Sequence, residues 1–384
     1  MNSLIIRLGI ISFFADVSSE MLYPITPIFL TTVLGASMTS VGLIEGCAEA
    51  IASLLKTYAG TWSDRIGKRK PFIILGYLFA ALAKPLTGLA TVWPQVLFAR
   101  SFDRVGKGLR SAPRDAMLSE SVAPELRGEA FGLHRAMDTM GATIGPILAI
   151  VYLHFAHDQL RTIYLLAFIP GLLAVLLAMS LREKKEIKGD PTKRPVLIQP
   201  WKWASLPKPF RRYLTAWSLF SIANCSDVFL LMRAKEAGAT VTLTIMLYCF
   251  YNLIYAILSR PFGKWSDRIP RQKILALGLV VFALVYLGFS VASELWHFWF
   301  LFGVYGIYMA ATDGVGKALA VDLFDPKLKA TAVGILGTMT GISTVIASTI
   351  AGLLWDHLGS SWAFIYGALG AILATALLLK PQPS

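Results

Sequence analysis

Residues 60–70 read Gly-Thr-Trp-Ser-Asp-Arg-Ile-Gly-Lys-Arg-Lys, and residues 263–273 read Gly-Lys-Trp-Ser-Asp-Arg-Ile-Pro-Arg-Gln-Lys. The second stretch follows the first by about 203 residues, and both stand between apolar runs of membrane-spanning length. Self-similarity at this distance indicates that the chain consists of two copies of one half. Parallel duplication of a six-helix unit builds one large class of membrane transporters. The repeated stretch therefore bears on fold and function together.

The composition agrees with a membrane protein. Hydrophobic residues make up 55% of the chain and charged residues only 15%, whereas charged residues are about 25% of a soluble domain. The net charge of +13 is concentrated in a few loops and one linker, without the aromatic-interleaved basic surface that binds nucleic acid. The sequence therefore predicts the lipid bilayer as a partner and no nucleic acid.

Twelve apolar stretches are long enough to cross a bilayer core of about 30 Å, which takes roughly 20 helical residues. They cover residues 4–33, 40–61, 71–91, 93–112, 128–153, 160–181, 211–233, 240–262, 272–292, 296–320, 328–353 and 360–380. The first is too long for the apolar part of a signal peptide and lacks a small-residue cleavage site, which predicts a retained helix. The predicted fold is an all-α membrane protein with two pseudo-symmetric six-helix halves, 1–181 and 211–384, joined by a basic linker, 182–210.

Basic loops predict the orientation. Residues 182–212 hold ten Lys and Arg against three Asp and Glu, and the stretches 60–70 and 263–273 are also basic. The loops on the opposite side, 31–40 and 90–95, carry no charge. Because positively charged loops stay in the cytoplasm, both chain ends are expected there, and the expected location is the bacterial inner membrane.

With these features the chain resembles the major facilitator superfamily over nearly its whole length. The family's signature after its second helix is Gly-x-x-x-Asp-Arg-x-Gly-Arg/Lys-Arg/Lys. The first copy matches it at every position, with Gly60, Asp64, Arg65, Gly67, Lys68 and Arg69. The second copy keeps Gly263, Asp267, Arg268 and Arg271 and has Pro270 in place of the second glycine. The resemblance implies secondary transport by alternating access.

The fifth predicted helix carries the family's antiporter signature, Gly-x-x-x-Gly-Pro, at Gly141, Gly145 and Pro146. Two glycines one turn apart allow close helix contact, and a proline loosens the helical hydrogen bonding. Ordinary close packing in a membrane bundle would also explain them. The family's fourth-helix arginine is ambiguous, because Arg104 fits the spacing to Gly108 whereas Arg100 lies nearer the expected depth. The resemblance to the drug/proton antiporter branch implies export in exchange for protons.

The doubled basic loop is expected to act as a gate. Asp64 and Arg65 lie where helix meets water, so a carboxylate there can pair with a helix end or an arginine in one conformation and release it in another. A loop that only determines topology is the alternative.

Carboxylates at membrane depth are costly and by default mark a pathway or a coupling site. Asp16 and Glu20 share one face of the first predicted helix, and Glu45 and Glu49 form a stripe with Lys56 on the second. Few cations are expected near them, since Lys56 can satisfy only one. Carboxyl groups that are shielded from water and close together bind protons more readily, so these four are candidates for proton coupling. A cage for a hard cation, or a purely structural role, stays open.

The fourth and fifth predicted helices carry further charges. Asp103, Arg104, Arg135 and Asp138 are expected to neutralise one another within the amino-terminal half. Asp138 is also a candidate in proton coupling.

The expected cargo is a small amphipathic organic molecule bound near mid-bilayer, where such transporters hold their substrates. Candidate contacts combine polar anchors with aromatic surface. They are Tyr23, Arg100, Asn224, Asp227, Tyr251 and Asn252. Uptake of a small metabolite, or transport of a metal or metal chelate through the acidic residues, is the alternative.

The chain lacks reaction chemistry in its motifs. It has no Gly-Lys-Ser/Thr phosphate loop, no Gly-x-Ser-x-Gly and no His-Glu-x-x-His. No cofactor and no metal centre are expected, since the three cysteines fall inside predicted spans and no His/Cys cluster occurs. A receptor or scaffold with a transporter's shape would not need so many buried carboxylates. The sequence therefore predicts a transporter, acting as a monomer, and not an enzyme.

Overall fold

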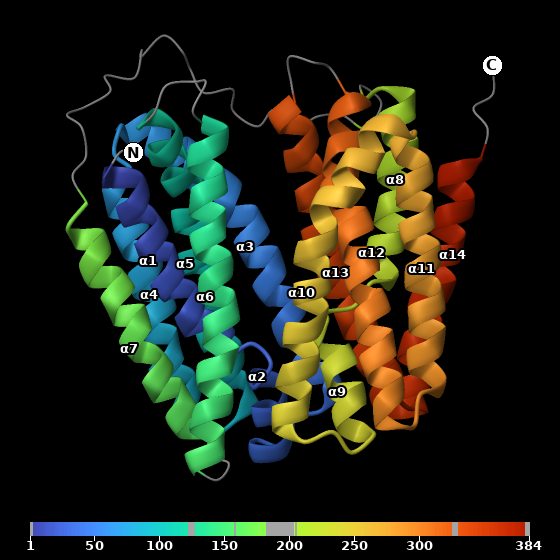
Figure 1. Ribbon diagram of the computed structural model, residues 1–384, viewed down its shortest axis with the longest axis horizontal. Helices are drawn as coiled ribbons and strands as arrows, with labels where there is room; N and C mark the ends of the chain where they lie inside the picture. The colour runs from blue at the N-terminus through green and yellow to red at the C-terminus, as the bar shows by residue number, and fades with distance from the viewer. Residues whose placement is uncertain are drawn as a thin grey trace. The chain divides into compact units, whose positions relative to one another are not determined.

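The computed structural model describes residues 3–121, 127–156, 159–181, 203, 206–324 and 329–380. All the regular elements in these residues are helices (Figure 1). The chain divides into two compact units. The first comprises Met1–Ala36 and Cys47–Gln199, and the second Ser37–Gly46 and Pro200–Ser384. The predicted linker 182–210 lies mostly outside the described residues.

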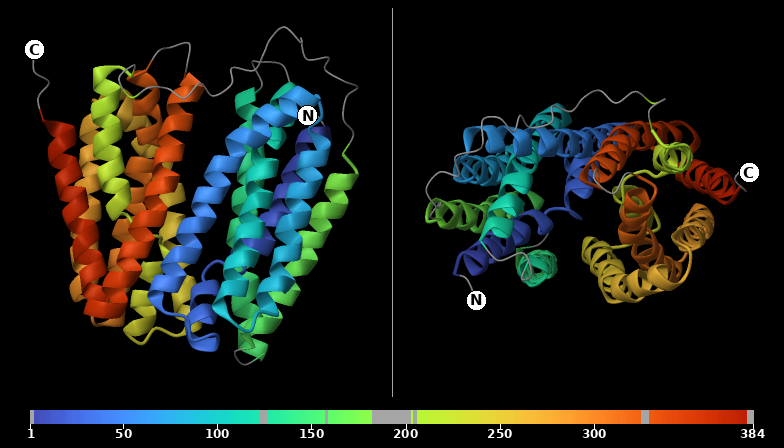
Figure 2. Two further views of the ribbon diagram at one scale, coloured as in Figure 1. Left: turned by 180° about the vertical axis from the view of Figure 1, so that it is seen from behind. Right: turned by 90° about the horizontal axis from the view of Figure 1, so that it is seen from above.

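Most helices of the first half are long and run side by side (Figures 1 and 2). The helices of this half are α1 (Ser3–Glu20), α2 (Thr26–Ile28), the π-helical turn η1 (Phe29–Val33), α3 (Met38–Ile66), α4 (Lys70–Gly88), α5 (Trp93–Glu120), α6 (Arg127–Ala156) and α7 (Leu160–Met179). The beginning of α3 belongs to the second unit. There the Asp356 carboxylate accepts hydrogen bonds from the backbone N–H groups of Met38 and Thr39, at 2.9 and 2.8 Å, and so caps α3.

The second unit continues with a matching series of helices. They are α8 (Lys208–Ala223), α9 (Val228–Glu236), α10 (Val241–Arg268), α11 (Arg271–Val291), α12 (Leu295–Asp322), α13 (Lys329–Leu358) and α14 (Ser360–Leu379). Its interior is rich in buried aromatic rings, among them Phe220, Phe282 and Tyr286. The Phe282 and Tyr286 rings stack with centroids 3.9 Å apart.

The sequence repeat reappears in the packing. In the first unit α4 packs on α5 and α7, and α1 packs on α6 and α7. In the second unit α11 packs on α12 and α14, and α8 packs on α13 and α14. Each pair in one unit thus has its counterpart in the other, as expected of a duplicated six-helix bundle.

Ten helical stretches of the described chain are long and apolar enough to span a membrane, with α8 and α9 together forming one of them. The helices α1 and α5 fall outside these ten because of their charges, which include Asp16 and Glu20 in α1 and Arg100 and Asp103 in α5. Counting these two, the described residues contain the twelve predicted membrane helices.

Two of the predicted spans are interrupted. The stretch 4–33 is predicted as one helix, but α1 ends at Glu20, ahead of Pro24 and Pro27, which lack the N–H group a continuous helix needs. The stretch 211–233 breaks at residues 224–227, where Asn224 has φ −88° and ψ 93°. The Ser226 N–H group, which the break removes from the helical hydrogen bonding, donates to Ser348 Oγ at 3.1 Å. Side chains near such a break can face a cavity with unpaired backbone groups beside them.

Candidate functional site

The helices α1 and α6 touch through the glycines of the antiporter signature. A Cβ atom on Gly141 would lie 2.4 Å from the Phe13 carbonyl oxygen, and one on Gly145 would lie 2.7 Å from the Val17 carbonyl oxygen. Any larger residue would push the two backbones apart. The signature therefore has a structural consequence here, because it brings α6 directly against the part of α1 that carries Asp16.

This contact joins two carboxyl groups. Asp138 lies one turn before Gly141, and its side chain shares a hydrogen bond with Asp16, with Glu20 and Arg110 close enough to interact electrostatically with Asp16. An ionised carboxylate only accepts hydrogen bonds, so a hydrogen bond between two carboxyl groups requires a proton on one of them. The α1–α6 contact thus brings together Asp16 and Asp138, two of the residues predicted for proton coupling. The sequence names both residues as coupling candidates, but it groups Asp138 with Asp103, Arg104 and Arg135 and does not predict its contact with Asp16.

The helix α5 brings cations to the carboxylates. The Lys107 ammonium is close enough to interact electrostatically with Glu49, Asp16 and Glu20. The sequence predicts few cations near these carboxylates and names only Lys56, whereas Lys107 and Arg110 of α5 also lie near them. Spacing along α1 and α3 gave no information about α5, which contacts both. Glu45 is buried but lies on the stretch Ser37–Gly46 that belongs to the second unit.

A buried ion pair links α4 to α5. Lys84 Nζ lies 2.9 Å from Asp103 Oδ1, and the two side chains are only 6% and 8% exposed. Arg104 Nε lies 3.8 Å from the other Asp103 oxygen. Asp103 and Arg104 thus neutralise each other as predicted, although Lys84 is the closer partner. The Arg135 side chain lies outside the described residues.

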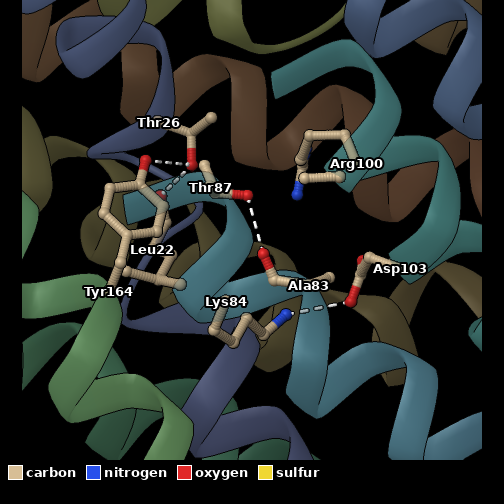
Figure 3. A pocket seen from close by; sticks show the side chains of 9 residues that line it. Leu22, Thr26, Ala83, Lys84, Thr87, Arg100, Asp103 and Tyr164 are labelled. Carbon is tan, nitrogen blue, oxygen red and sulfur yellow. Dashed lines mark hydrogen bonds and ion pairs between the residues drawn. The ribbon is translucent and has the colours of Figure 1, made fainter. Parts of the chain in front are cut away.

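This ion pair lines a small cavity (Figure 3). Arg100 and Asp103 of α5 face Lys84 and Thr87 of α4, and the Tyr164 hydroxyl donates to Thr26 Oγ1 at 3.0 Å. The cavity has room for about one water molecule. Arg100 therefore lies in a polar pocket too small for an organic solute in this conformation.

Sequence reasoning missed a buried polar centre at Ser12. Its Oγ atom lies 3.1 Å from the Tyr77 hydroxyl and 2.9 Å from His134 Nε2, and it accepts a hydrogen bond from Arg114 at 3.1 Å. A serine within an apolar run carries no signal of such a role. The centre ties α1 to α4, α5 and α6.

In the second unit, Asp227 lies at the break between α8 and α9. Its Oδ2 atom accepts a hydrogen bond from the Tyr251 hydroxyl at 2.9 Å, and its Oδ1 atom accepts one from the Tyr305 hydroxyl. The Asn224 amide donates to the Tyr308 hydroxyl at 3.4 Å. The structure thus brings Asn224, Asp227 and Tyr251 together. Sequence reasoning missed Tyr305 and Tyr308, whose i, i+3 spacing was the available signal.

The other predicted contacts are placed differently. The Asn252 amide donates to the Tyr248 carbonyl of its own helix at 2.9 Å, and Tyr23 is half-buried in the turn after α1. Both remain predictions as substrate contacts.

The doubled basic stretches end in matching ion pairs. Arg69 donates to Ser63 Oγ at 2.6 Å and to Glu120 at the end of α5, at 3.0 Å. Arg271 pairs in the same way with Asp322 at the end of α12. Gly67 has φ 68°, a conformation that favours glycine, whereas Pro270 stands at this point of the second copy.

Several gating candidates carry little structural information. The side chains of Asp64, Arg65 and Asp267, and the surroundings of Gly263, lie outside the described part of the chain. Arg268 is exposed. Their gating role stays a prediction.

Comparison with known proteins agrees with this architecture. The sequence profile of the Major Facilitator Superfamily matches residues 8–234 and 223–384. The chain is 36% identical over 378 residues to an uncharacterised MFS-type transporter of Methanocaldococcus jannaschii, covering 97% of this chain and 93% of the relative. It is 23% identical over 360 residues to the multidrug resistance protein MdtH of Salmonella arizonae, covering 90% and 82%.

A solved structure shares the fold. A bacterial homologue of the human lysosomal transporter Spinster superposes with a TM-score of 0.78 at 15% identity, covering 97% of this chain and 95% of the other. The duplicated bundle and these matches lead to one conclusion: the chain belongs to the Major Facilitator Superfamily and is a multi-pass membrane transporter, not an enzyme.

Proposed function

We propose that this protein exports a small organic solute in exchange for protons. The observation that carries the proposal is the Asp16–Asp138 pair, whose shared hydrogen bond requires one proton. An ion-coupled transporter needs a group that binds its ion in one state and releases it in another. A carboxyl pair held at a helix contact meets this need, because separating the helices would remove the partner that favours the bound proton.

Two observations favour exchange over uptake. The Gly141 and Gly145 contact that holds the pair together coincides with the antiporter signature. A relative at 23% identity is named a multidrug resistance protein. The solute site proposed for this exporter includes Asn224, Asp227 and Tyr251.

We further propose that the chain ends and the basic stretches face the cytoplasm and that the basic stretches form the gate. The ion pairs Arg69–Glu120 and Arg271–Asp322 support the second point, because each ties the start of one helix to the end of the next. Such pairs can be exchanged between conformations. Cysteine-accessibility labelling of the 182–212 stretch tests the orientation, which labelling from the outer face would contradict.

Proton exchange is tested in proteoliposomes that contain a trapped pH-sensitive dye. Candidate organic solutes are added in turn, and a transported solute should move protons in the opposite direction. Asp16→Asn and Asp138→Asn should each abolish uphill transport driven by a pH gradient, while downhill exchange of solute partly survives. If both variants still concentrate solute against its gradient, the coupling proton binds elsewhere, and Asp103 is the next candidate.

A metal substrate is the competing hypothesis. Within the described residues, no three His, Cys, Asp or Glu side chains are placed to hold a metal ion. Calorimetry with divalent metals decides between the two. Tight binding that Asp16→Asn and Glu49→Gln both eliminate would favour the metal and overturn the organic solute.

A further inference from the structure

We propose that Asp227 and the tyrosine rings around it form a binding site for an organic cation, so that the solute carries a positive charge. The inference rests on the proposed transport function and adds the chemical class of the solute.

The Asp227 carboxylate lies at the start of a helix but does not cap it. Asp227 stands directly before α9, where an aspartate usually accepts hydrogen bonds from the first N–H groups of the helix. Its side chain makes no such capping bond. Both of its oxygens instead accept hydrogen bonds from the hydroxyls of Tyr251 and Tyr305. Helix capping therefore does not account for an acidic residue at this helix break.

The Asp227 carboxylate has only neutral hydrogen-bond donors beside it. Phenol hydroxyls are neutral, so when Asp227 is ionised the two hydrogen bonds leave its negative charge uncompensated. Among the described residues, Asp227 forms no ion pair with a Lys, Arg or His, while Lys317 pairs with Asp313 and Arg233 with Glu236. The acidic residues of the first unit differ, because Lys107 and Arg110 lie near them. A cationic ligand would supply the missing counter-charge.

Four aromatic rings lie close together beside the Asp227 carboxylate. The Tyr251 ring lies 5.5 Å from the Tyr305 ring and 5.9 Å from the Phe302 ring, and the Tyr305 and Tyr308 rings are 5.2 Å apart between centroids. Aromatic faces attract a cation within about 6 Å, and several rings together recognise quaternary ammonium groups. A carboxylate flanked by rings combines both attractions.

A ligand can approach Asp227 from outside, and Asn224 offers it a further polar contact. Asp227 and Asn224 are both partly exposed, whereas the Tyr251 and Tyr305 rings are buried, so a ligand would reach the carboxylate first and the ring faces only after the rings turn. Asn224 Oδ1 is buried and has no hydrogen-bond partner. A buried acceptor without a partner is costly, and an ammonium N–H group is a suitable donor for it. The carboxylate and the rings therefore fit an organic cation in general, and a protonated amine would in addition satisfy Asn224 Oδ1.

The test compares two probes of the same shape and opposite charge, tetraphenylphosphonium and tetraphenylborate, by equilibrium binding to the purified full-length protein in detergent. The protein should bind the cation and reject the anion. Asp227→Asn, which keeps the size of the side chain, should weaken cation binding at least about tenfold, since it removes one partner of a close charge pair. Tyr305→Phe keeps the ring and should weaken binding less.

Asp313→Asn is the matched control, because Asp313 also accepts a hydrogen bond from a tyrosine, Tyr255, but is neutralised by Lys317. It should bind tetraphenylphosphonium like the wild type. Equal binding of both probes, unchanged affinity in Asp227→Asn, or no binding of tetraphenylphosphonium and benzyltrimethylammonium by the wild type would each overturn the inference. If Asp227→Asn does not fold, discrimination between the probes by the wild type still decides.

The two proposals fail in distinguishable ways. If Asp227→Asn keeps its affinity for tetraphenylphosphonium and the wild type still exchanges this probe for protons in proteoliposomes, the cation site is wrong and the transport proposal stands. If the cation binds through Asp227 but its addition moves no protons, the site stands and proton exchange fails.

Discussion

Removing either partner of the buried Lys84–Asp103 ion pair should destabilise the protein, and by unequal amounts. The two charged atoms lie 2.9 Å apart, and both side chains are more than nine-tenths buried. Losing one partner of such a pair costs about 3–5 kcal/mol, because it leaves an uncompensated buried charge. In Lys84→Met, Arg104 at 3.8 Å still partly compensates Asp103, so the expected loss is about 3 kcal/mol.

Asp103→Asn should cost more, near about 5 kcal/mol. It removes the carboxylate that interacts with Lys84, Arg104 and Arg100 together, and leaves three cations in one place. A further consequence is that Lys84→Met should partly rescue Asp103→Asn, because the double variant has one fewer uncompensated cation.

Thermal unfolding in detergent, followed by intrinsic fluorescence, measures these losses. At about 2 °C per kcal/mol, Lys84→Met should lower Tm by roughly 6 °C. Lys317→Met is the matched control, because the Lys317–Asp313 pair has side chains 56% and 42% exposed and should contribute less than about 1 kcal/mol. Equal losses for Lys84→Met and Lys317→Met, or additive losses in the double variant, would refute the reasoning.

Three further variants test other parts of the structure. Gly141→Ala should lower Tm by an amount corresponding to about 1–3 kcal/mol and weaken proton coupling, because its Cβ would overlap the Phe13 carbonyl; unchanged coupling would mean that the α1–α6 contact does not hold the carboxyl pair. Asp64→Asn should lower the turnover in proteoliposomes without reducing membrane insertion, and undiminished turnover would leave the basic stretch with a role in topology only. Gly67→Ala should lower Tm by an amount corresponding to about 1 kcal/mol, since φ is 68° there, and an unchanged Tm would show that the turn adapts.

Much of the fold followed from the sequence because membrane helices are local. Their length and apolar character can be read from consecutive residues. The repeat at 60–70 and 263–273 predicted that the chain has two similar halves. The interruptions at Glu20 and at Asn224 were missed, although Pro24, Pro27 and the run of polar residues 224–227 marked both places. Hydropathy averaged over a long window hides a break of a few residues.

The candidate site was only half predictable, for a physical reason. Buried charges such as Asp16 and Asp227 stand out in an apolar run, so they were found. Their partners lie on other helices, and only the packing decides that Asp138 meets Asp16 or that Tyr305 meets Asp227. Helix periodicity gives the face of a residue but not the helix that covers it.

The most direct test of the account concerns the proton shared by Asp16 and Asp138. Infrared difference spectra of the purified protein at neutral pH detect the C=O stretching band of a protonated carboxyl group without any knowledge of the solute. The account predicts such a band in the wild type and in the control Asp356→Asn, and its loss in Asp16→Asn and in Asp138→Asn. A band that survives unchanged in both variants would contradict the claim that this pair binds the coupling proton.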